Sequence, residues 1–180
     1  MKDFLNNSLL LTRPISDNKT FSDYLKVCDI NINIVCGPLL EIKHEKLKVE
    51  GLSPGAVIIT SKNCIQSLKM VNLDFNCVAF CVGDATAREA KSVGFKVKSA
   101  GGNGADLLKL IKKEFNPCKG ELIYFRGKDV ACDIAEVLRK SGYNVKELVC
   151  YRQSPILLEN STVNDIRNSL IGAVVLFSSR

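Results

Sequence analysis

Short apolar runs alternate with longer amphipathic segments along most of the chain. Each run has about the length of a strand and is rich in Val, Ile, Leu or Phe. The runs cover residues 8–12, 32–36, 56–60, 77–82, 95–98, 121–125, 144–150 and 173–177. Runs that are apolar on both faces are typical of the buried strands of a parallel sheet. We therefore predict that these runs form parallel sheets.

Six amphipathic segments between the runs have the length and the boundaries of helices. They cover residues 17–27, 62–71, 84–93, 104–115, 129–141 and 162–170. Asn103 is a good N-cap for the fourth segment, and Gly94 and Gly142 follow the third and the fifth. The Gly-rich stretch before that fourth segment lacks the order of a phosphate-binding loop, so we interpret it as a turn. Strand–helix–strand alternation predicts an α/β architecture with right-handed crossovers.

The chain also contains two pairs of similar strand ends. Residues 9–14 resemble residues 122–127, since both are apolar strands that end in Arg and a turn former. Residues 57–61 resemble residues 174–179, since both are apolar strands that end in hydroxyl residues. The two pairs are separated by nearly the same number of positions, which indicates an internal duplication. Compared with the first copy, the second is expected to be short by about 60 residues.

Composition and charge narrow the class of protein. Hydrophobic residues make up 46% of the chain and charged residues 24%, which predicts a packed core. The net charge of +6 is compatible with an anionic ligand, and a solvated basic surface would explain it equally well. The basic residues are dispersed and aromatic residues are few, so we expect no binding of nucleic acid.

The eight cysteines and the single histidine do not form a metal-binding pattern. No two cysteines are spaced as C-x-x-C, so we expect neither a zinc site nor any other metal. Several cysteines lie inside apolar runs, where a reduced thiol acts as a small hydrophobic group. The start of the chain does not have the pattern of a signal peptide, and no apolar stretch approaches the ~20 residues of a membrane span. We therefore expect a cytoplasmic protein that does not bind membranes.

Polar motifs follow most of the apolar runs, and their order is informative. They are Thr-Arg-Pro at 12–14, Thr-Ser-x-Asn at 60–63, Val-Gly-x-x-Thr at 82–86, the Gly-rich stretch at 101–105, Arg-Gly at 126–127, Tyr151 and the strand end at 177–179. Each motif alone is weak. In this order and spacing they resemble the uroporphyrinogen-III synthase family across nearly the whole chain.

The resemblance implies a fold and a domain organisation. Members of that family have two flavodoxin-like parallel-sheet domains joined by two crossings of the chain. Residues 38–152 would form one complete domain, and residues 1–37 with 153–180 would form the other. Family members usually continue past the equivalent of Arg180, so this second domain is expected to be incomplete. An incomplete sheet exposes an edge, which would promote association of an otherwise monomeric chain.

The resemblance also implies an activity and a set of site residues. The family cyclises hydroxymethylbilane, a linear tetrapyrrole with eight carboxylates, with loss of water and inversion of the last pyrrole ring, and it needs no cofactor. In open parallel sheets, ligands bind beyond the carboxyl ends of the strands. The substrate-binding candidates that match the motifs there are Arg13, Ser61, Asn63, Gly83, Thr86, Arg126, Gly127 and Ser178.

Simpler roles are open for several of these residues. The hydroxyl groups of Ser61 and Thr86 would also serve as helix caps. Arg13 and Arg126 would also form surface ion pairs, and Gly127 would also form a turn.

Tyr151 is the candidate for direct participation, because it matches the family's Tyr at a domain crossing. Its hydroxyl would help the hydroxymethyl oxygen of the substrate to leave, as an acid or a hydrogen-bond donor. A free Tyr has a pKa near ~10, so it can donate a proton at neutral pH. The alternative is a structural Tyr at a hinge.

Two other functions remain compatible with the sequence. The chain would be a truncated, inactive homologue if the second copy is needed for catalysis. It would alternatively be a non-catalytic α/β module that binds anions.

Overall fold

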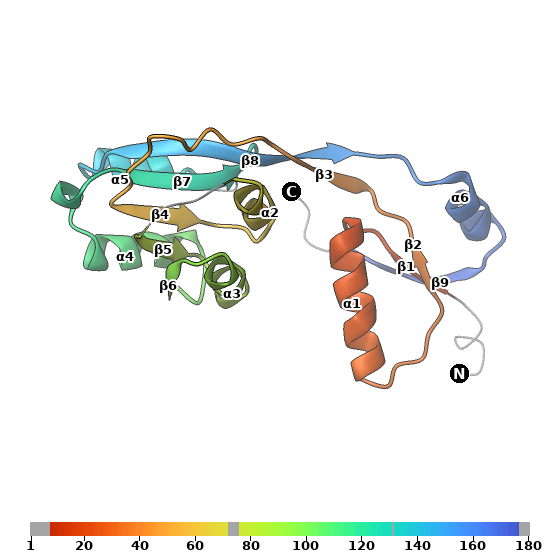
Figure 1. Cartoon of the computed structure of the whole chain (residues 1–180). Coiled ribbons are helices and arrows are strands. Elements are labelled where there is room, and N and C mark those ends of the chain that lie inside the picture. The colour runs from red at the N-terminus through yellow and green to blue at the C-terminus, as the bar shows by residue number, and fades with distance from the viewer. Residues whose placement is uncertain (1–7, 72–75, 131, 177–180) are drawn as a thin grey trace. The chain divides into compact units, whose positions relative to one another are not determined.

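The computed structural model describes residues 8–71, 76–130 and 132–176, which belong to two compact units (Figure 1). Unit 1 consists of Met1–Ile42 and Gln153–Arg180, and unit 2 of Lys43–Arg152. The chain passes from one unit to the other twice, within strands β3 (Leu40–His44) and β8 (Val145–Pro155). These two strands are hydrogen-bonded neighbours.

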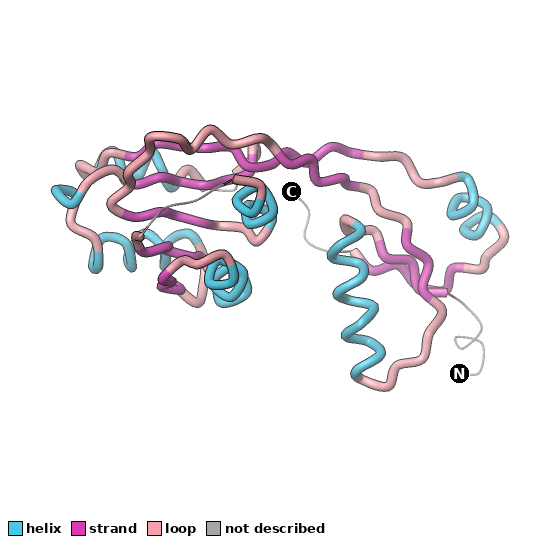
Figure 2. Tube along the Cα trace, viewed as in Figure 1, coloured by secondary structure: helices cyan, strands magenta, loops and turns pink. Residues whose placement is uncertain are grey.

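Unit 2 is built on a six-stranded sheet with the order β3-β8-β7-β4-β5-β6 (Figure 2). Besides β3 and β8, this sheet contains β4 (Ala56–Ile59), β5 (Val78–Cys81), β6 (Lys96–Ser99) and β7 (Leu122–Gly127). The pairs β8–β7, β7–β4, β4–β5 and β5–β6 are all parallel. The carboxyl ends of five neighbouring strands therefore lie along one edge of the sheet.

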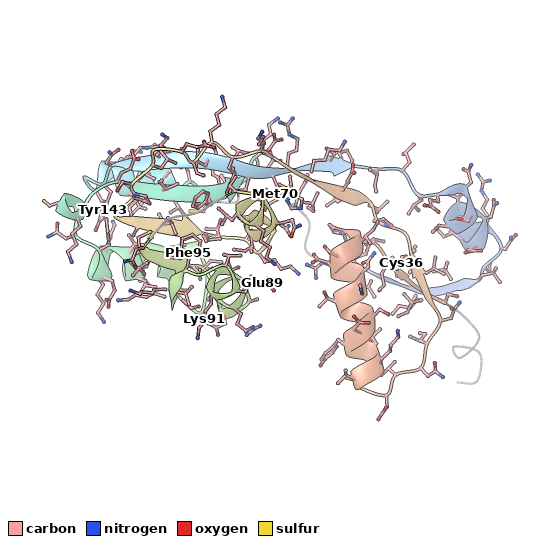
Figure 3. All side chains as sticks on the ribbon, in the orientation of Figure 1. Cys36, Met70, Glu89, Lys91, Phe95 and Tyr143 are labelled. Carbon is pink, nitrogen blue, oxygen red and sulfur yellow. The ribbon has the colours of Figure 1, made fainter. Side chains whose placement is uncertain are left out.

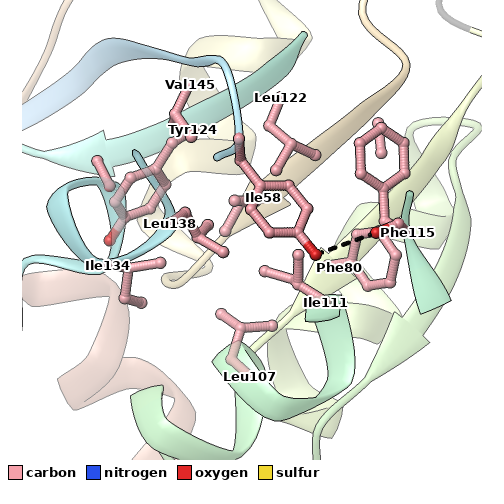
Figure 4. Packing of buried hydrophobic residues seen from close by; sticks show 13 residues of the cluster. Ile58, Phe80, Leu107, Ile111, Phe115, Leu122, Tyr124, Ile134, Leu138 and Val145 are labelled. Atoms are coloured by element: carbon pink, nitrogen blue, oxygen red, sulfur yellow. Dashed lines mark hydrogen bonds between the residues drawn. The ribbon is translucent and has the colours of Figure 1, made fainter. Parts of the chain in front are cut away.

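Helices cover both faces of this sheet. They are α2 (Asn63–Lys69), α3 (Asp84–Ser92), α4 (Gly104–Glu114) and α5 (Ile134–Lys140), with a short 3₁₀ helix at Pro117–Lys119. Alternate strand residues such as Ile58 and Tyr124 pack with Leu107 of α4 in one apolar cluster (Figure 4). The residues between them, such as Ile59 and Phe125, are equally buried. Burial of both faces explains why these strands are continuously apolar.

Two aromatic side chains of that cluster contact each other. Tyr143 stacks against Phe115 with 6.5 Å between ring centroids, and its hydroxyl donates a hydrogen bond to the Phe115 carbonyl (3.2 Å; Figure 4). The buried phenol therefore keeps a partner for its polar end. Phe95, which precedes β6, is also buried, whereas Met70 after α2 is exposed (Figure 3).

Unit 1 has a three-stranded parallel sheet with the order β2-β1-β9. Its elements are β1 (Ser8–Leu11), α1 (Ile15–Val27), β2 (Ile34–Cys36), α6 (Asn160–Arg167) and β9 (Ile171–Val175). Among the residues described in this unit, the buried hydrophobic side chains are those of Leu10, Leu11 and Leu25. Most of the large hydrophobic side chains that remain exposed belong to unit 1.

The α/β class with parallel sheets agrees with the prediction, and the differences have local causes. Strand β3 was not predicted, because its alternating polar sequence carries no apolar run. Helix α5 begins at Ile134 rather than at residue 129, because Asp133 caps it by accepting a hydrogen bond from the Glu136 amide (2.9 Å). The turn predicted before α4 is confirmed, since Asn103 forms a capping box with Asp106.

Candidate functional site

Seven of the predicted site residues lie along the carboxyl edge of the unit 2 sheet. The sheet order places the ends of β8, β7, β4 and β5 next to one another. Ser61, Asn63, Gly83 and Thr86 follow the ends of β4 and β5, Arg126 and Gly127 end β7, and Tyr151 lies within β8 opposite Gly127. Motifs that are far apart in the sequence thus meet at the edge where open α/β sheets bind ligands.

At the end of β4, the Ser61 hydroxyl already has a local contact. Its oxygen accepts a hydrogen bond from the Asn63 amide (3.2 Å), which forms a tight turn into α2. The residue at the cap position of α2 is Lys62, without a side-chain cap. Ser61 therefore shapes the turn before the helix rather than capping it. The side chains of Ser61 and Asn63 are both half-buried.

At the end of β5, Gly83 occupies the cap position of α3 in an extended conformation. No atom lies within 4 Å of the place where a Cβ would stand, so the backbone here is open to approach. The first-turn amides of α3 lack a side-chain cap, and such amides favour a carboxylate. Thr86 lies in the first turn with only 6% of its surface exposed, and because Gly83 holds the cap position, the capping alternative for Thr86 is wrong.

At the end of β7, Arg126 is held by several groups. One guanidinium nitrogen donates to the carbonyl groups of residues 127 (3.0 Å) and 128 (2.8 Å). Nε lies 2.7 Å from Glu147 Oε1, an ion pair whose N–H direction falls outside hydrogen-bond geometry. The other Glu147 oxygen lies 3.0 Å from Arg139 of α5. The ion-pair alternative for Arg126 is thus confirmed, and its carboxylate partner is shared with a second guanidinium.

Two residues before Arg126 on β7, the buried phenol of Tyr124 contacts the hydroxyl group of Thr60. The Tyr124 hydroxyl lies 3.2 Å from Thr60 Oγ1, and either oxygen can be the donor. Burial raises the pKa of Tyr124 above its ordinary value, and the hydrogen bond to Thr60 opposes that shift. Tyr124 therefore stays protonated at neutral pH and serves as part of the core.

Within β8, opposite the last residue of β7, the Tyr151 ring lies against Gly127. Tyr151 is 4% exposed, and it is the register partner of Gly127. The backbone amide of Lys128 donates a hydrogen bond to the Tyr151 carbonyl (2.8 Å). This bond continues the β7–β8 pairing one residue beyond Gly127. A Cβ on Gly127 would lie 2.8 Å from Tyr151 Cζ. Gly127 and Tyr151 are therefore in contact, as expected if both belong to one substrate site.

The two remaining candidates lie outside this edge. Arg13 follows β1 in unit 1, and its guanidinium lies 2.8 Å from the Asp17 carboxylate, so its ion-pair alternative is also confirmed. Ser178 lies outside the described residues.

Two residues that were not predicted from the sequence contact the residues of this edge or their neighbours. Glu147 joins Arg126 to Arg139. Ser67, which is fully buried on α2, donates a hydrogen bond to the Cys150 carbonyl (2.6 Å). A signal for Ser67 existed, since a polar residue among apolar neighbours on the inward face of a helix needs a buried partner.

Three thiols of unit 2 act as core groups, whereas those of Cys118 and Cys132 are exposed. Cys64, Cys81 and Cys150 are fully buried. A hydrogen bond with the Cys150 thiol, followed by burial, raises the pKa of Cys64 well above its usual range. Within the described ranges, no group of three or more His, Cys, Asp or Glu side chains is arranged to hold a metal. None of the helices described is both long enough and apolar enough to cross a membrane.

Comparison with known proteins identifies what this chain resembles. A family model described as uroporphyrinogen-III synthase HemD matches residues 26–180. The solved uroporphyrinogen-III synthetase of Helicobacter pylori is 20% identical, with a TM-score of 0.57; the alignment covers 91% of this chain and 68% of that one. A mutant uroporphyrinogen III synthase of Thermus thermophilus is 16% identical, with a TM-score of 0.54 and coverage of 93% and 71%. At these identities the two structures show a shared fold. No curated protein matches the chain.

Proposed function

The chain belongs to the uroporphyrinogen-III synthase family, and from that premise we propose that it closes hydroxymethylbilane to uroporphyrinogen III. The enzymes of this family are lyases of heme biosynthesis that act on a small molecule. The match over residues 26–180 is the observation that carries the proposal. The gathering of seven candidate residues at one sheet edge supports it.

In the proposed reaction, the hydroxymethyl C–O bond breaks and its oxygen leaves as water. Tyr151 supplies a hydrogen bond or a proton to that oxygen. After the macrocycle has closed, the pyrrole carbon that formed the new bond loses its proton. This proton restores the tyrosine hydroxyl to its starting state. The last pyrrole ring inverts through a spiro intermediate while the chain holds one folded conformation of the substrate. Positioning of reactive groups, rather than a strong nucleophile, supplies most of the rate.

The carboxylates of the substrate are assigned to positive and hydrogen-bonding groups. Arg126 has a forked guanidinium, the shape that best matches a carboxylate. The first turn of α3, which begins after Gly83, offers backbone amides. The full proposed binding set is Arg13, Ser61, Asn63, Gly83, Thr86, Arg126, Gly127 and Ser178. No metal or organic cofactor takes part in the proposed reaction.

The proposal also includes the cellular compartment and the oligomeric state of the chain. The fully buried thiols of Cys64, Cys81 and Cys150 support a reducing cytoplasm as the working compartment. We propose a chain that binds no nucleic acid and acts as a monomer, with association through the sheet edge at β9 as the route to dimers. The domain division 1–37 with 153–180, against 38–152, belongs to the same proposal.

A coupled cyclisation assay tests the activity. The bilane is generated in place, and the two uroporphyrinogen isomers are separated. Because uncatalysed closure gives isomer I, a predominance of isomer III is the expected result. Formation of isomer I alone by a folded sample would contradict the proposal and favour an inactive homologue.

The role of Tyr151 has a separate test. Tyr151→Phe removes the hydroxyl and keeps the ring, so the fold should be retained. Loss of a general acid typically costs about a hundredfold or more in rate, and we expect kcat for isomer III to fall by about that factor. Unchanged turnover in the coupled assay would leave Tyr151 with a structural role only.

A further inference from the structure

The strand that carries Tyr151 contains one extra residue at this point. Arg126 is paired with Val149, but the next residue of β7, Gly127, is paired with Tyr151. Cys150 is therefore the additional residue of a β-bulge. A bulge breaks the regular alternation of side chains, and bulges near active sites re-aim a particular side chain. Here the bulge places Tyr151 opposite Gly127.

The bulge is fixed by contacts from outside the β7–β8 ladder. The Cys150 carbonyl accepts a hydrogen bond from the Ser67 hydroxyl (2.6 Å) and another from the Glu45 amide (2.7 Å). Ser67 lies on α2 and is fully buried, so its hydroxyl cannot exchange this partner for water. The carbonyl freed by the bulge is therefore held in one direction.

Gly127 supplies the space that the ring occupies. A Cβ at this position would lie 2.8 Å from Cζ, 2.9 Å from the hydroxyl oxygen and 3.1 Å from Cε2 of Tyr151. Two of these distances are shorter than real Cβ atoms show, and the rigid ring is buried, so it cannot yield as a flexible side chain would. The φ angle of Gly127 is not in the left-handed region, so its backbone conformation does not itself require glycine. The need for glycine here comes from the close approach of the phenol.

We propose that Gly127 and Ser67 are positioning residues for the Tyr151 phenol. The side-chain-free surface of Gly127 sets how deep the ring lies, and the bulge held by Ser67 sets its direction. This inference rests on the proposed function, because it concerns the group assigned to the departing oxygen. It gives Gly127 a role through Tyr151 in addition to the proposed contact with substrate.

The first test compares Gly127→Ala with Gly104→Ala in the coupled assay. A Cβ on Gly104 meets its nearest atoms at 3.7 Å, an ordinary contact, so this variant is the matched control. A displacement of about 1 Å can cost about a hundredfold in rate, so we expect kcat for isomer III to fall by about that factor in Gly127→Ala. Because positioning acts on the transition state, kcat should fall by a larger factor than the KM for the bilane rises. A folded Gly127→Ala variant with the kcat of the control would overturn the proposal.

The second test does not depend on activity. Tyrosine labelled with ¹³C at Cζ gives a resonance for each of the four tyrosines, and Tyr151→Phe assigns the one of interest. Gly127→Ala should shift the Tyr151 resonance and leave those of Tyr24, Tyr124 and Tyr143 in place. In urea unfolding, Gly127→Ala should lower the midpoint in the native background but not in the Tyr151→Leu background, which lacks the three contacting atoms. An unmoved resonance, or equal midpoint losses in both backgrounds, would refute the contact.

Ser67→Ala keeps the inference testable if Gly127→Ala does not fold. This change adds no atom and removes one donor to Cys150, together with the 3.4 Å contact between Ser67 Oγ and His44 Nδ1. The Tyr151 resonance should therefore shift or broaden while kcat falls more than KM rises. Ser92→Ala, which removes an exposed hydroxyl that donates to the Glu89 carbonyl, is the control. If the native chain forms only isomer I while Gly127→Ala still moves the Tyr151 resonance, the proposed function fails and the positioning contact stands. If the native chain forms isomer III and neither variant moves resonance or kcat, the positioning inference alone fails.

Discussion

Arg126 shows how a single residue can combine a structural and a functional role. Its guanidinium contacts two carbonyl groups and Glu147, but Glu147 is shared with Arg139. One carboxylate between two guanidinium groups leaves the positive charge only partly balanced. A substrate carboxylate at this edge would therefore still be attracted to Arg126.

Arg126→Gln should weaken binding of the bilane. Hydrogen bonds to charged groups contribute about 1.5–3 kcal/mol, so we expect KM to rise by about tenfold or more. Arg139→Gln is the matched control, because it removes the other partner of Glu147 from α5 without touching the strand end. The measurement is the bilane dependence of isomer III formation. Equal KM values for the two variants would show that Arg126 has only its structural role.

The buried thiol of Cys81 makes a prediction about alkaline stability. Burial raises the pKa of Cys81 to about 12, whereas an unfolded thiol has a pKa of about 8.5. A folded-state pKa above the unfolded value stabilises the fold fully below about pH 8.5, and this contribution is lost as the pH rises toward 12. Urea midpoints measured from about pH 8 to about pH 10.5 should therefore fall with pH.

Two variants isolate the thiol that is responsible. Cys81→Ala should show a shallower decline of the urea midpoint with pH, since its contribution is removed. Cys118→Ala removes an exposed thiol and should keep the slope of the native chain. If all three slopes coincide, desolvation of Cys81 has no part in the alkaline loss.

At the scale of elements, the sequence predicted features that depend on local signals, such as the start of α4. Asn103 begins α4 as expected, because a cap residue is a local signal that needs no tertiary information. Strand β3 could not be predicted, because it exists only through its pairing with β8. The bulge at Cys150 is likewise invisible in a sequence, since it is a property of two paired strands. The motif order predicted which residues gather at the sheet edge, but not that Arg126 shares Glu147 with Arg139 or that Ser67 holds the bulge.

The cap of α4 makes a prediction about stability. Asn103 Oδ1 accepts hydrogen bonds from the Ala105 (2.8 Å) and Asp106 (3.2 Å) amides. Asn103→Ala leaves both donors without this partner and should cost about 1 kcal/mol in the free energy of unfolding. Asn103→Ser keeps an acceptor and should recover most of that loss. Urea unfolding that finds the serine variant as unstable as the alanine variant would point to packing rather than capping.

At the scale of the whole molecule, the sequence duplication corresponds to the strand topology. Strands β1 and β9 of unit 1 carry the repeats of β7 and β4 in unit 2. The order β2-β1-β9 accordingly matches β8-β7-β4. Unit 2 continues beyond β4 with β5 and β6, which have no counterpart in the part of unit 1 that the structure describes. The two units therefore differ in how much apolar surface each can bury.

This difference predicts that unit 1 opens before unit 2. Each fully buried aliphatic side chain contributes about 1.5–3 kcal/mol, and the described part of unit 1 buries far fewer of them. Native-state hydrogen exchange at rising urea should release the amides of β1 and β9 at lower concentrations than those of β4 and β7. Leu122→Ala, in the unit 2 core, should lower protection in β4 and β7 and leave the exchange of β1 unchanged. Leu11→Ala should have the opposite effect, since Leu11 is fully buried in β1. A single transition shared by all four strands, and shifted equally by both variants, would instead mean that the two units fold as one cooperative structure.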